Sequence, residues 1–137
     1  RDTQTSSGLG DVYKRQPYIT QSWINWTDMN ESHHMHAHSN SIISGVLYLN
    51  ADRKYDSIKF HKHNNYQTLK FPTSNYHVFN SQSWTFPVHT GEIILFPSYL
   101  SHEVSQKIGD NLRTSLSFNT YVKGTIGEKM ELTELIL

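Results

Sequence analysis

Nine histidines are the residues of this 137-residue chain with the clearest capacity for chemistry. Four of them fall within residues 33–38, which read His-His-Met-His-Ala-His. Imidazole is the commonest metal ligand in proteins. On an extended chain alternate side chains share a face, so His34, His36 and His38 point to one side and His33 to the other. The segment therefore predicts a metal site in which two histidines at positions i and i+2 bind one ion.

A third ligand must come from elsewhere, because three successive residues on one face splay too far apart to close around one ion. The spacing does not choose between the pairs His34/His36 and His36/His38, and only His36 belongs to both. His102 is the best distant partner, since it follows an apolar strand and a proline corner where the chain returns to the fold. We therefore expect His36 and His102 in one metal centre that His34 or His38 completes.

The other histidines are expected outside this centre. His33 is expected to face solvent or to hydrogen-bond a metal ligand. Surface or strand-face positions are expected for four more: His61, His63, His77 and His89. A carboxylate, Asp28 or Glu31, replaces one histidine in an alternative in which the preceding turn folds inward.

Short β-strands must position these side chains. Runs rich in apolar, β-branched and aromatic residues predict strands over 18–26, 41–50, 57–62, 76–79, 84–88 and 92–96. Pro87 favours an edge strand or a bulge, and Thr90-Gly91 a turn. The tail, residues 128–137, predicts a short helix or a pairing strand. Many short strands separated by turns, with little helical periodicity, indicate one sandwich or barrel domain.

The clearest alternation in the chain runs over residues 112–122 and predicts a further strand. One face carries Leu112, Thr114, Leu116, Phe118, Thr120 and Val122. The opposite face carries Arg113, Ser115, Ser117, Asn119 and Tyr121. Arg113 and Ser115 therefore share one face of this strand.

Composition limits the function classes. Twelve Lys and Arg balance twelve Asp and Glu without a basic run, so we expect no nucleic-acid or membrane partner. The absence of cysteine excludes disulfides, thiolate metal sites and cysteine nucleophiles, and it fits a cytoplasmic location. Residues 1–16, rich in Ser, Thr, Gly and charge, are expected to be a disordered or non-native arm before a domain over 17–137. A homodimer is left open as an assembly.

Three segments together resemble a family of 2-oxoglutarate- and Fe(II)-dependent oxygenases found in bacteria and phages. They begin at His36, Gly91 and Arg113 and read HAHSNSIISGVLYL, GEIILFPSYLSH and RTSLSFN. The resemblance covers roughly residues 22–122. It implies a mainly β, single-domain, cupin-like double-stranded β-helix, or jelly roll, with iron between its two sheets. It also implies that the metal ligands are His36, His38 and His102.

The resemblance further implies that Arg113 pairs with the far carboxylate of 2-oxoglutarate. An arginine fork binds a carboxylate through two hydrogen bonds, which a buried dicarboxylate needs. Ser115 and Tyr48 are expected to add hydroxyl donors, although an ordinary surface ion pair for Arg113 and a core role for Tyr48 are the alternatives. The expected cofactors are Fe(II), the co-substrate 2-oxoglutarate and O2.

The sequence departs from the wider superfamily at one ligand. Most members place a carboxylate two residues after the first histidine, where this chain has His38. The expected activity is hydroxylation of a substrate that the sequence does not specify, with conversion of 2-oxoglutarate to succinate. A cupin-like three-histidine dioxygenase or zinc hydrolase without 2-oxoglutarate chemistry is the alternative, and a non-catalytic domain is a third hypothesis.

Overall fold

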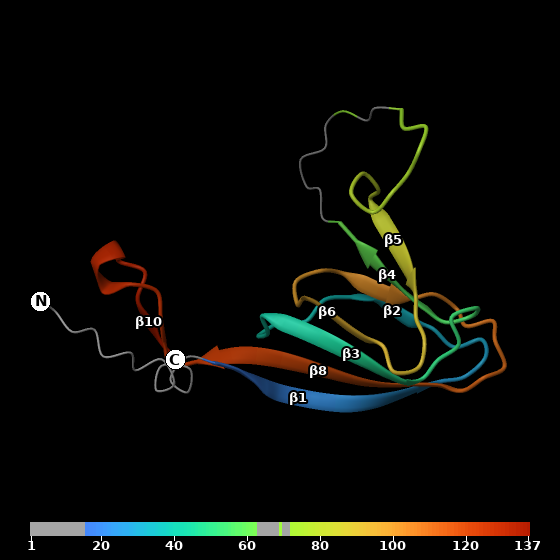
Figure 1. Cartoon of the computed structure of the whole chain (residues 1–137), viewed down its shortest axis with the longest axis horizontal. Coiled ribbons are helices and arrows are strands. Elements are labelled where there is room, and N and C mark those ends of the chain that lie inside the picture. Colours follow the sequence, from blue (N-terminus) through green and yellow to red (C-terminus); the bar gives the residue numbers. More distant parts are fainter. Residues whose placement is uncertain (1–15, 63–68, 70–71) are drawn as a thin grey trace, which may run out of the picture.

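Two four-stranded antiparallel sheets stack face to face in the computed structural model, which describes residues 16–62, 69 and 72–137 (Figure 1). The first sheet has the order β1-β8-β3-β6, formed by Gln16–Thr27, Arg113–Lys123, Ile43–Asn50 and Ile93–Pro97. The second has the order β2-β7-β4-β5, formed by His33–His36, His102–Val104, Ser57–His61 and Ser83–Pro87. Pairing of strands distant in sequence within each sheet makes the fold a double-stranded β-helix, which confirms the predicted jelly roll.

Most predicted strands are present, and one prediction is wrong. Residues 76–79 are not a strand: 76 and 77 are irregular, and 78 and 79 begin a turn. The Asn80 side chain bonds the local backbone there, because its Oδ1 accepts from the His77 N–H (2.8 Å). Pro87 lies in β5, an edge strand, as its missing N–H predicts. Gly91 has φ +86°, a left-handed conformation that the predicted turn requires of it.

Both alternatives for the tail occur within it. A 3₁₀ helix spans Lys129–Glu131, and β10 (Leu135–Ile136) pairs with β9 (Thr125–Ile126) in a hairpin beyond the end of β8 (Figure 1). Gln16, the last residue of the expected arm, is the first residue of β1, and the rest of that arm lies outside the described residues.

The space between the sheets is largely polar. Among the described residues, the buried apolar cluster is small and consists of Tyr48, Ile58, Phe60, Val88 and Phe96. The strand β8 alternates as predicted, and its buried face is the polar one, with Arg113, Ser115, Ser117 and Asn119. Buried polar groups need hydrogen-bond partners, so these side chains either bind a ligand or form hydrogen bonds with one another.

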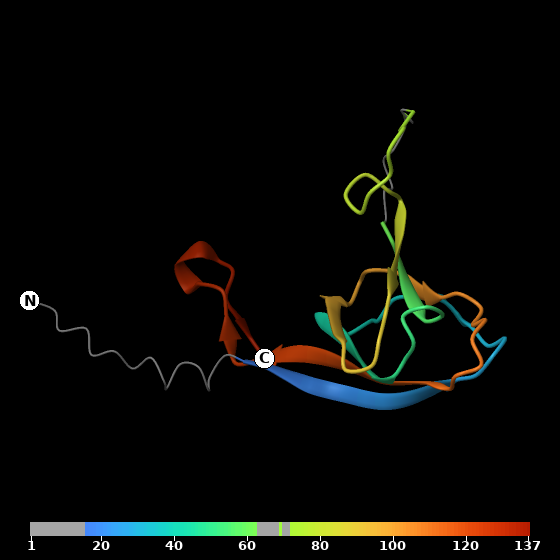
Figure 2. The same ribbon diagram turned by 45° about the vertical axis from the view of Figure 1, so that its right-hand side comes forward.

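The apolar face of β8 points outward from the sandwich. A Cβ on Gly45 would lie 2.2 Å from Phe118 Cζ, so only glycine lets this ring lie flat on β3. Ile24 and Trp26 on β1 are exposed on this same outer face, beside the Leu116 and Thr114 positions. No described helix or strand covers this face (Figure 2). Within the described residues, no helix has the length and apolar character needed to cross a membrane.

Candidate metal centre

Three histidines meet between the sheets at the β2–β7 pair. His36, the last residue of β2, is the register partner of His102, the first residue of β7. His38 follows β2, and its backbone N–H donates to the Ser98 carbonyl (2.9 Å). This hydrogen bond holds the segment after β2 against the corner that follows β6. Potential ligand atoms of the three imidazoles all lie within 4.8 Å of one another. The structure thus brings together the three histidines that the family resemblance implies.

The hydrogen bonds of the imidazoles suit a metal ion. Each Nδ1 faces an oxygen acceptor: His36 the His34 carbonyl (2.8 Å), His102 the Leu100 carbonyl (3.0 Å), and His38 the Asn119 Oδ1 (2.5 Å). Nδ1 is therefore the protonated nitrogen, which leaves the Nε2 lone pair of each ring for a ligand. His38 Nε2 is buried without a hydrogen-bond partner in the described structure, so the residues present fit a divalent cation.

Burial favours the neutral form of His102. His102 is 5% exposed, and desolvation lowers its pKa to about 4 although the Leu100 carbonyl acts in the opposite direction. Phe96 packs edge-on against its ring, with 4.7 Å between ring centroids. Trp23 stacks on His38 at 5.6 Å. Neutral imidazole is the form that binds a metal, so these apolar walls favour the ligand state at neutral pH.

The rival ligands lie elsewhere. His34 is exposed, and its ring is not part of the cluster. Asp28 and Glu31 bond to their own turn: the Asp28 N–H donates to Glu31 Oε2 (2.7 Å), and the Met29 N–H donates to Asp28 Oδ1 (2.8 Å). The described residues that come together at the centre therefore include no carboxylate.

His33 lies on the inner side of β2, not on the side opposite His36 that strict alternation predicts. The pairing of β2 with β7 is irregular: His33 pairs with Val104 and His36 with His102, so three steps along β2 match two along β7. Such a bulge shifts the alternation by one residue. His33 is half-buried and lies 3.5 Å from Thr27 Oγ1 through its Nε2. Burial, followed by the charge of Arg113, lowers its pKa.

A cavity of about 70 Å³ joins the histidines to Arg113. Arg113, the first residue of β8, is 3% exposed. Its Nη2 donates to Thr27 Oγ1 (3.2 Å) and its Nη1 to the Ser57 carbonyl (3.5 Å), while its Nε has no partner in the described structure. No carboxylate of the described residues forms an ion pair with it. A buried guanidinium in this state calls for an anion.

Ser115 and Tyr48 line the same cavity, and each is 2% exposed. Ser115 lies two residues after Arg113 on the buried face of β8, as the alternation predicts. Burial raises the pKa of Tyr48, so its phenol stays neutral and keeps its proton as a hydrogen-bond donor. Their roles as co-substrate ligands stay predictions.

Two site residues carried no assigned role in the sequence. Asn119 accepts from His38 and also from the Ser44 hydroxyl (2.8 Å), and its place on the Arg113 face of β8 was the signal that could have found it. Thr27 is fully buried and bonds Arg113 across the β1–β8 pair. It lies just beyond the predicted strand 18–26, and nothing in its local sequence marks it.

Of the remaining histidines, the described ones (His61, His77 and His89) lie outside the cluster, as expected. His61 Nε2 is 3.2 Å from Glu103 Oε1, and His89 Nδ1 is 2.7 Å from Glu92 Oε2. His77 lies at the start of the turn over residues 78–80, and His63 lies outside the described residues. A larger cavity, of about 600 Å³ between the β5 and β6 edges, shares Phe96 with the first but is lined by none of the three clustered histidines.

Fold and site define a jelly-roll protein with a candidate metal centre between its sheets. Residues 21–119 match the model of a family described as "Putative 2OG-Fe(II) oxygenase", and the chain belongs to this family. The predicted family membership is therefore confirmed. The family name gives the cofactors as iron(II) and 2-oxoglutarate, and oxygenases use O2. No curated protein sequence matches the chain.

Solved structures show the same fold. One is an oxidoreductase of the 2OG-Fe(II) oxygenase family from Burkholderia pseudomallei, with 18% identity, a TM-score of 0.60, and coverage of 87% of this chain and 52% of that one. Another is HygX from Streptomyces hygroscopicus with iron bound, with 11% identity, a TM-score of 0.55, and coverage of 87% of this chain and 64% of that one. The chain thus spans about half the length of the first of these relatives and 64% of the second.

Proposed function

We propose that the protein is an Fe(II)- and 2-oxoglutarate-dependent oxygenase. The proposed reaction hydroxylates a C–H bond of the substrate and converts 2-oxoglutarate to succinate and CO2, with one oxygen atom of O2 entering each organic product. The observation that carries the proposal is one cavity lined by three clustered imidazoles and by a buried guanidinium without a carboxylate partner among the described residues. A metal ion would supply the positive charge that the imidazole lone pairs bind. A dianion would supply the negative charge that pairs with the guanidinium.

The residues divide the binding work between them. His36, His38 and His102 would hold iron, which when bound supplies the activation of O2. Arg113 would bind the far carboxylate of 2-oxoglutarate through its fork, and its burial strengthens that interaction because water competes less. Ser115 and Tyr48 would donate hydroxyl protons to the same ligand. The family name and the iron bound to HygX agree with this assignment.

Replacement of Arg113 tests the proposal. We expect Fe(II)-dependent succinate formation from 2-oxoglutarate in the unaltered protein and its loss, by about 100-fold or more, in Arg113→Ala, because a buried charge-assisted contact is removed. Arg53→Ala, at an exposed arginine, is the matched control and should keep full turnover. Equal turnover in Arg113→Ala and Arg53→Ala would contradict the role of Arg113.

A three-histidine zinc hydrolase is the second candidate. It is favoured by one observation: the clustered ligands among the described residues include no carboxylate, and three imidazoles leave a bound ion with its full +2 charge. Metal analysis of the purified protein separates the two candidates. Zinc in the protein, with no spectral change when 2-oxoglutarate is added to the Fe(II) form without oxygen, supports the hydrolase.

A further inference from the structure

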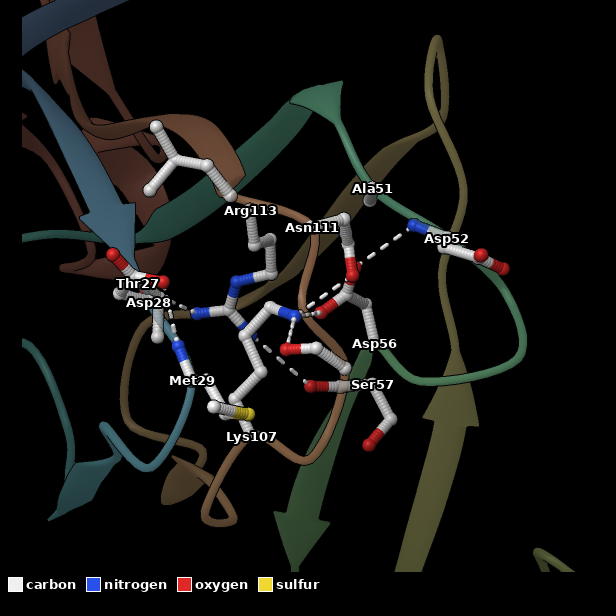
Figure 3. Close-up of polar contacts among 12 residues, drawn as sticks. Thr27, Asp28, Met29, Ala51, Asp52, Asp56, Ser57, Lys107, Asn111 and Arg113 are labelled. Carbon is white, nitrogen blue, oxygen red and sulfur yellow. Dashed lines mark hydrogen bonds and ion pairs between the residues drawn. The ribbon is translucent and has the colours of Figure 1, made fainter.

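A buried ion pair adjoins Arg113 in the interior (Figure 3). Lys107 and Asp56 are each 2% exposed, and Lys107 Nζ lies 3.8 Å from Asp56 Oδ1. Lys107 Nζ also donates to the Gly109 carbonyl (2.7 Å) and to Asn111 Oδ1 (2.8 Å). The Asn111 amide in turn donates to Asp56 Oδ2 (2.8 Å). A fully buried lysine is rare and calls for a specific reason.

The ion pair is placed on the segments that surround the guanidinium. Asp56 immediately precedes Ser57, whose carbonyl accepts from Arg113. The backbone of Lys107 forms two hydrogen bonds with the turn that follows Thr27. Its N–H donates to the Glu31 carbonyl (2.9 Å), and its carbonyl accepts from the Asn30 N–H (2.8 Å). The two partners of the pair therefore lie on the segments that adjoin both contacts of Arg113.

The charges in this region are unequal, with two cations and one carboxylate. Asp56 Oδ1 has no hydrogen-bond partner in the described structure, and neither has Arg113 Nε. Burial lowers the pKa of Arg113, while Tyr48 and Asp56 act in the opposite direction, so Asp56 is close enough to act on the guanidinium. A buried carboxylate that loses its cation is strongly destabilising, so an ion pair with another buried cation nearby becomes favourable. In the view of Figure 3, the Lys107 ammonium lies between the Asp56 carboxylate and the Arg113 guanidinium.

We propose that Lys107 is a positioning residue that holds Arg113 available for an anion. By pairing with Asp56, Lys107 prevents Arg113 from closing onto that carboxylate. The guanidinium then keeps its contacts with Thr27 and Ser57 and directs its remaining N–H groups to the cavity. The identity of the anion as 2-oxoglutarate rests on the proposed function.

This role makes predictions of opposite sign for the two partners. Lys107→Met frees Asp56 to capture Arg113, so 2-oxoglutarate should bind about 10-fold or more weakly, within the usual range of coupling between sites. Asp56→Asn removes the competing carboxylate and keeps the amide contacts, so binding should be as tight as in the unaltered protein or tighter. The double variant Lys107→Met/Asp56→Asn should recover binding to within about threefold. A purely structural pair predicts weaker binding in all three.

Calorimetric titration of 2-oxoglutarate into the Mn(II)-loaded protein measures these effects without turnover. Lys59→Met, in the partly exposed Lys59–Glu103 pair, is the control and should bind like the unaltered protein. Unchanged binding in Lys107→Met, or a double variant weaker than Lys107→Met, overturns the inference. If Lys107→Met does not fold, Asp56→Asn decides the matter, because weaker binding there contradicts competition.

A crystal structure of Lys107→Met, or of Lys107→Gln if the first variant does not fold, gives a second result that needs no co-substrate. We expect Arg113 to have left Thr27 and to form an ion pair with Asp56. Retention of the Thr27 and Ser57 contacts overturns the inference. Failure of the unaltered protein to bind 2-oxoglutarate contradicts the proposed function instead, and the crystal structure still decides the role of Lys107.

Discussion

The interior contains two polar clusters that differ in charge and in origin. The histidine cluster offers imidazole lone pairs, burial favours the neutral form of His102, and His36 and His102 face each other across one strand pair, β2 and β7. The cluster around Arg113 is charged and draws Lys107, Asp56 and Asn111 from loops and strand ends. A cation site needs lone pairs without positive charge, whereas an anion site needs positive charge in excess. The two clusters satisfy these opposite needs a short distance apart, along one cavity.

Removal of one imidazole should damage only the histidine cluster. We expect His102→Ala to lower iron affinity by about 100-fold or more. A residue that only hydrogen-bonds a metal ligand contributes about 10–100-fold to metal affinity, and a residue that binds the metal directly contributes more. His34→Ala removes an exposed neighbour of the cluster and should keep full iron content. Iron per chain, measured by mass spectrometry after dialysis, gives the result. A loss of iron in His34→Ala that matches the loss in His102→Ala contradicts the proposed ligand set.

Low pH should lower the stability of the metal-free protein because His102 becomes protonated. The pKa of His102 falls from 6.5 to about 4 on folding, so below pH 6.5 the unfolded chain binds the proton more readily. Stability is therefore fully present above about pH 6.5 and declines as the pH falls toward 4, by up to about 3 kcal/mol. Urea denaturation at several pH values, with a chelator present, measures this slope. His102→Asn should flatten it, and an unchanged slope in that variant contradicts the assignment.

Loss of one hydroxyl should affect only the charged cluster, and by the smallest amount. Thr27→Val removes the acceptor of the Arg113 Nη2 hydrogen bond at almost constant volume. We expect 2-oxoglutarate to bind about 10-fold more weakly, the usual cost of a hydrogen bond to a charged group. Iron content should not change. Thr20→Val, on the same strand and bonded to the Asn119 carbonyl, is the control for the substitution itself. Equal losses in both variants would contradict the role of the Thr27 hydroxyl, and a loss of iron in Thr27→Val would show that the two clusters are not separable.

The sequence predicted the histidine cluster better than the charged cluster around Arg113, for a physical reason. The short spacing of His36 and His38 limits how they are placed, and the proline corner before His102 marks a return to the fold. A sandwich or barrel and most of its strands followed from alternation and turn residues, whereas the jelly roll followed from the family resemblance. The resemblance also singled out Arg113, and the clean alternation of its strand placed Ser115 on the same face.

Lys107 and Asp56 could not be predicted in this way. They lie in loops 51 positions apart, and lone charged residues in polar loops are nearly always solvated. Their burial depends on how three separate segments meet, which no local pattern encodes. The inward position of His33 was missed for a related reason, since a bulge changes the alternation without changing the residue types. The segment over residues 76–79 was misread because its aromatic residues resemble a strand.

The irregular pairing of β2 also has a consequence for variation in chain length. Three steps along β2 match two along β7, so the strand carries one residue more than a regular ladder needs. Deletion of Met35, which is exposed, would restore an even ladder and still leave His33 and His36 on one inner side. An added residue would instead require a wider bulge. This stretch is therefore expected to tolerate the loss of one codon more readily than the gain of one.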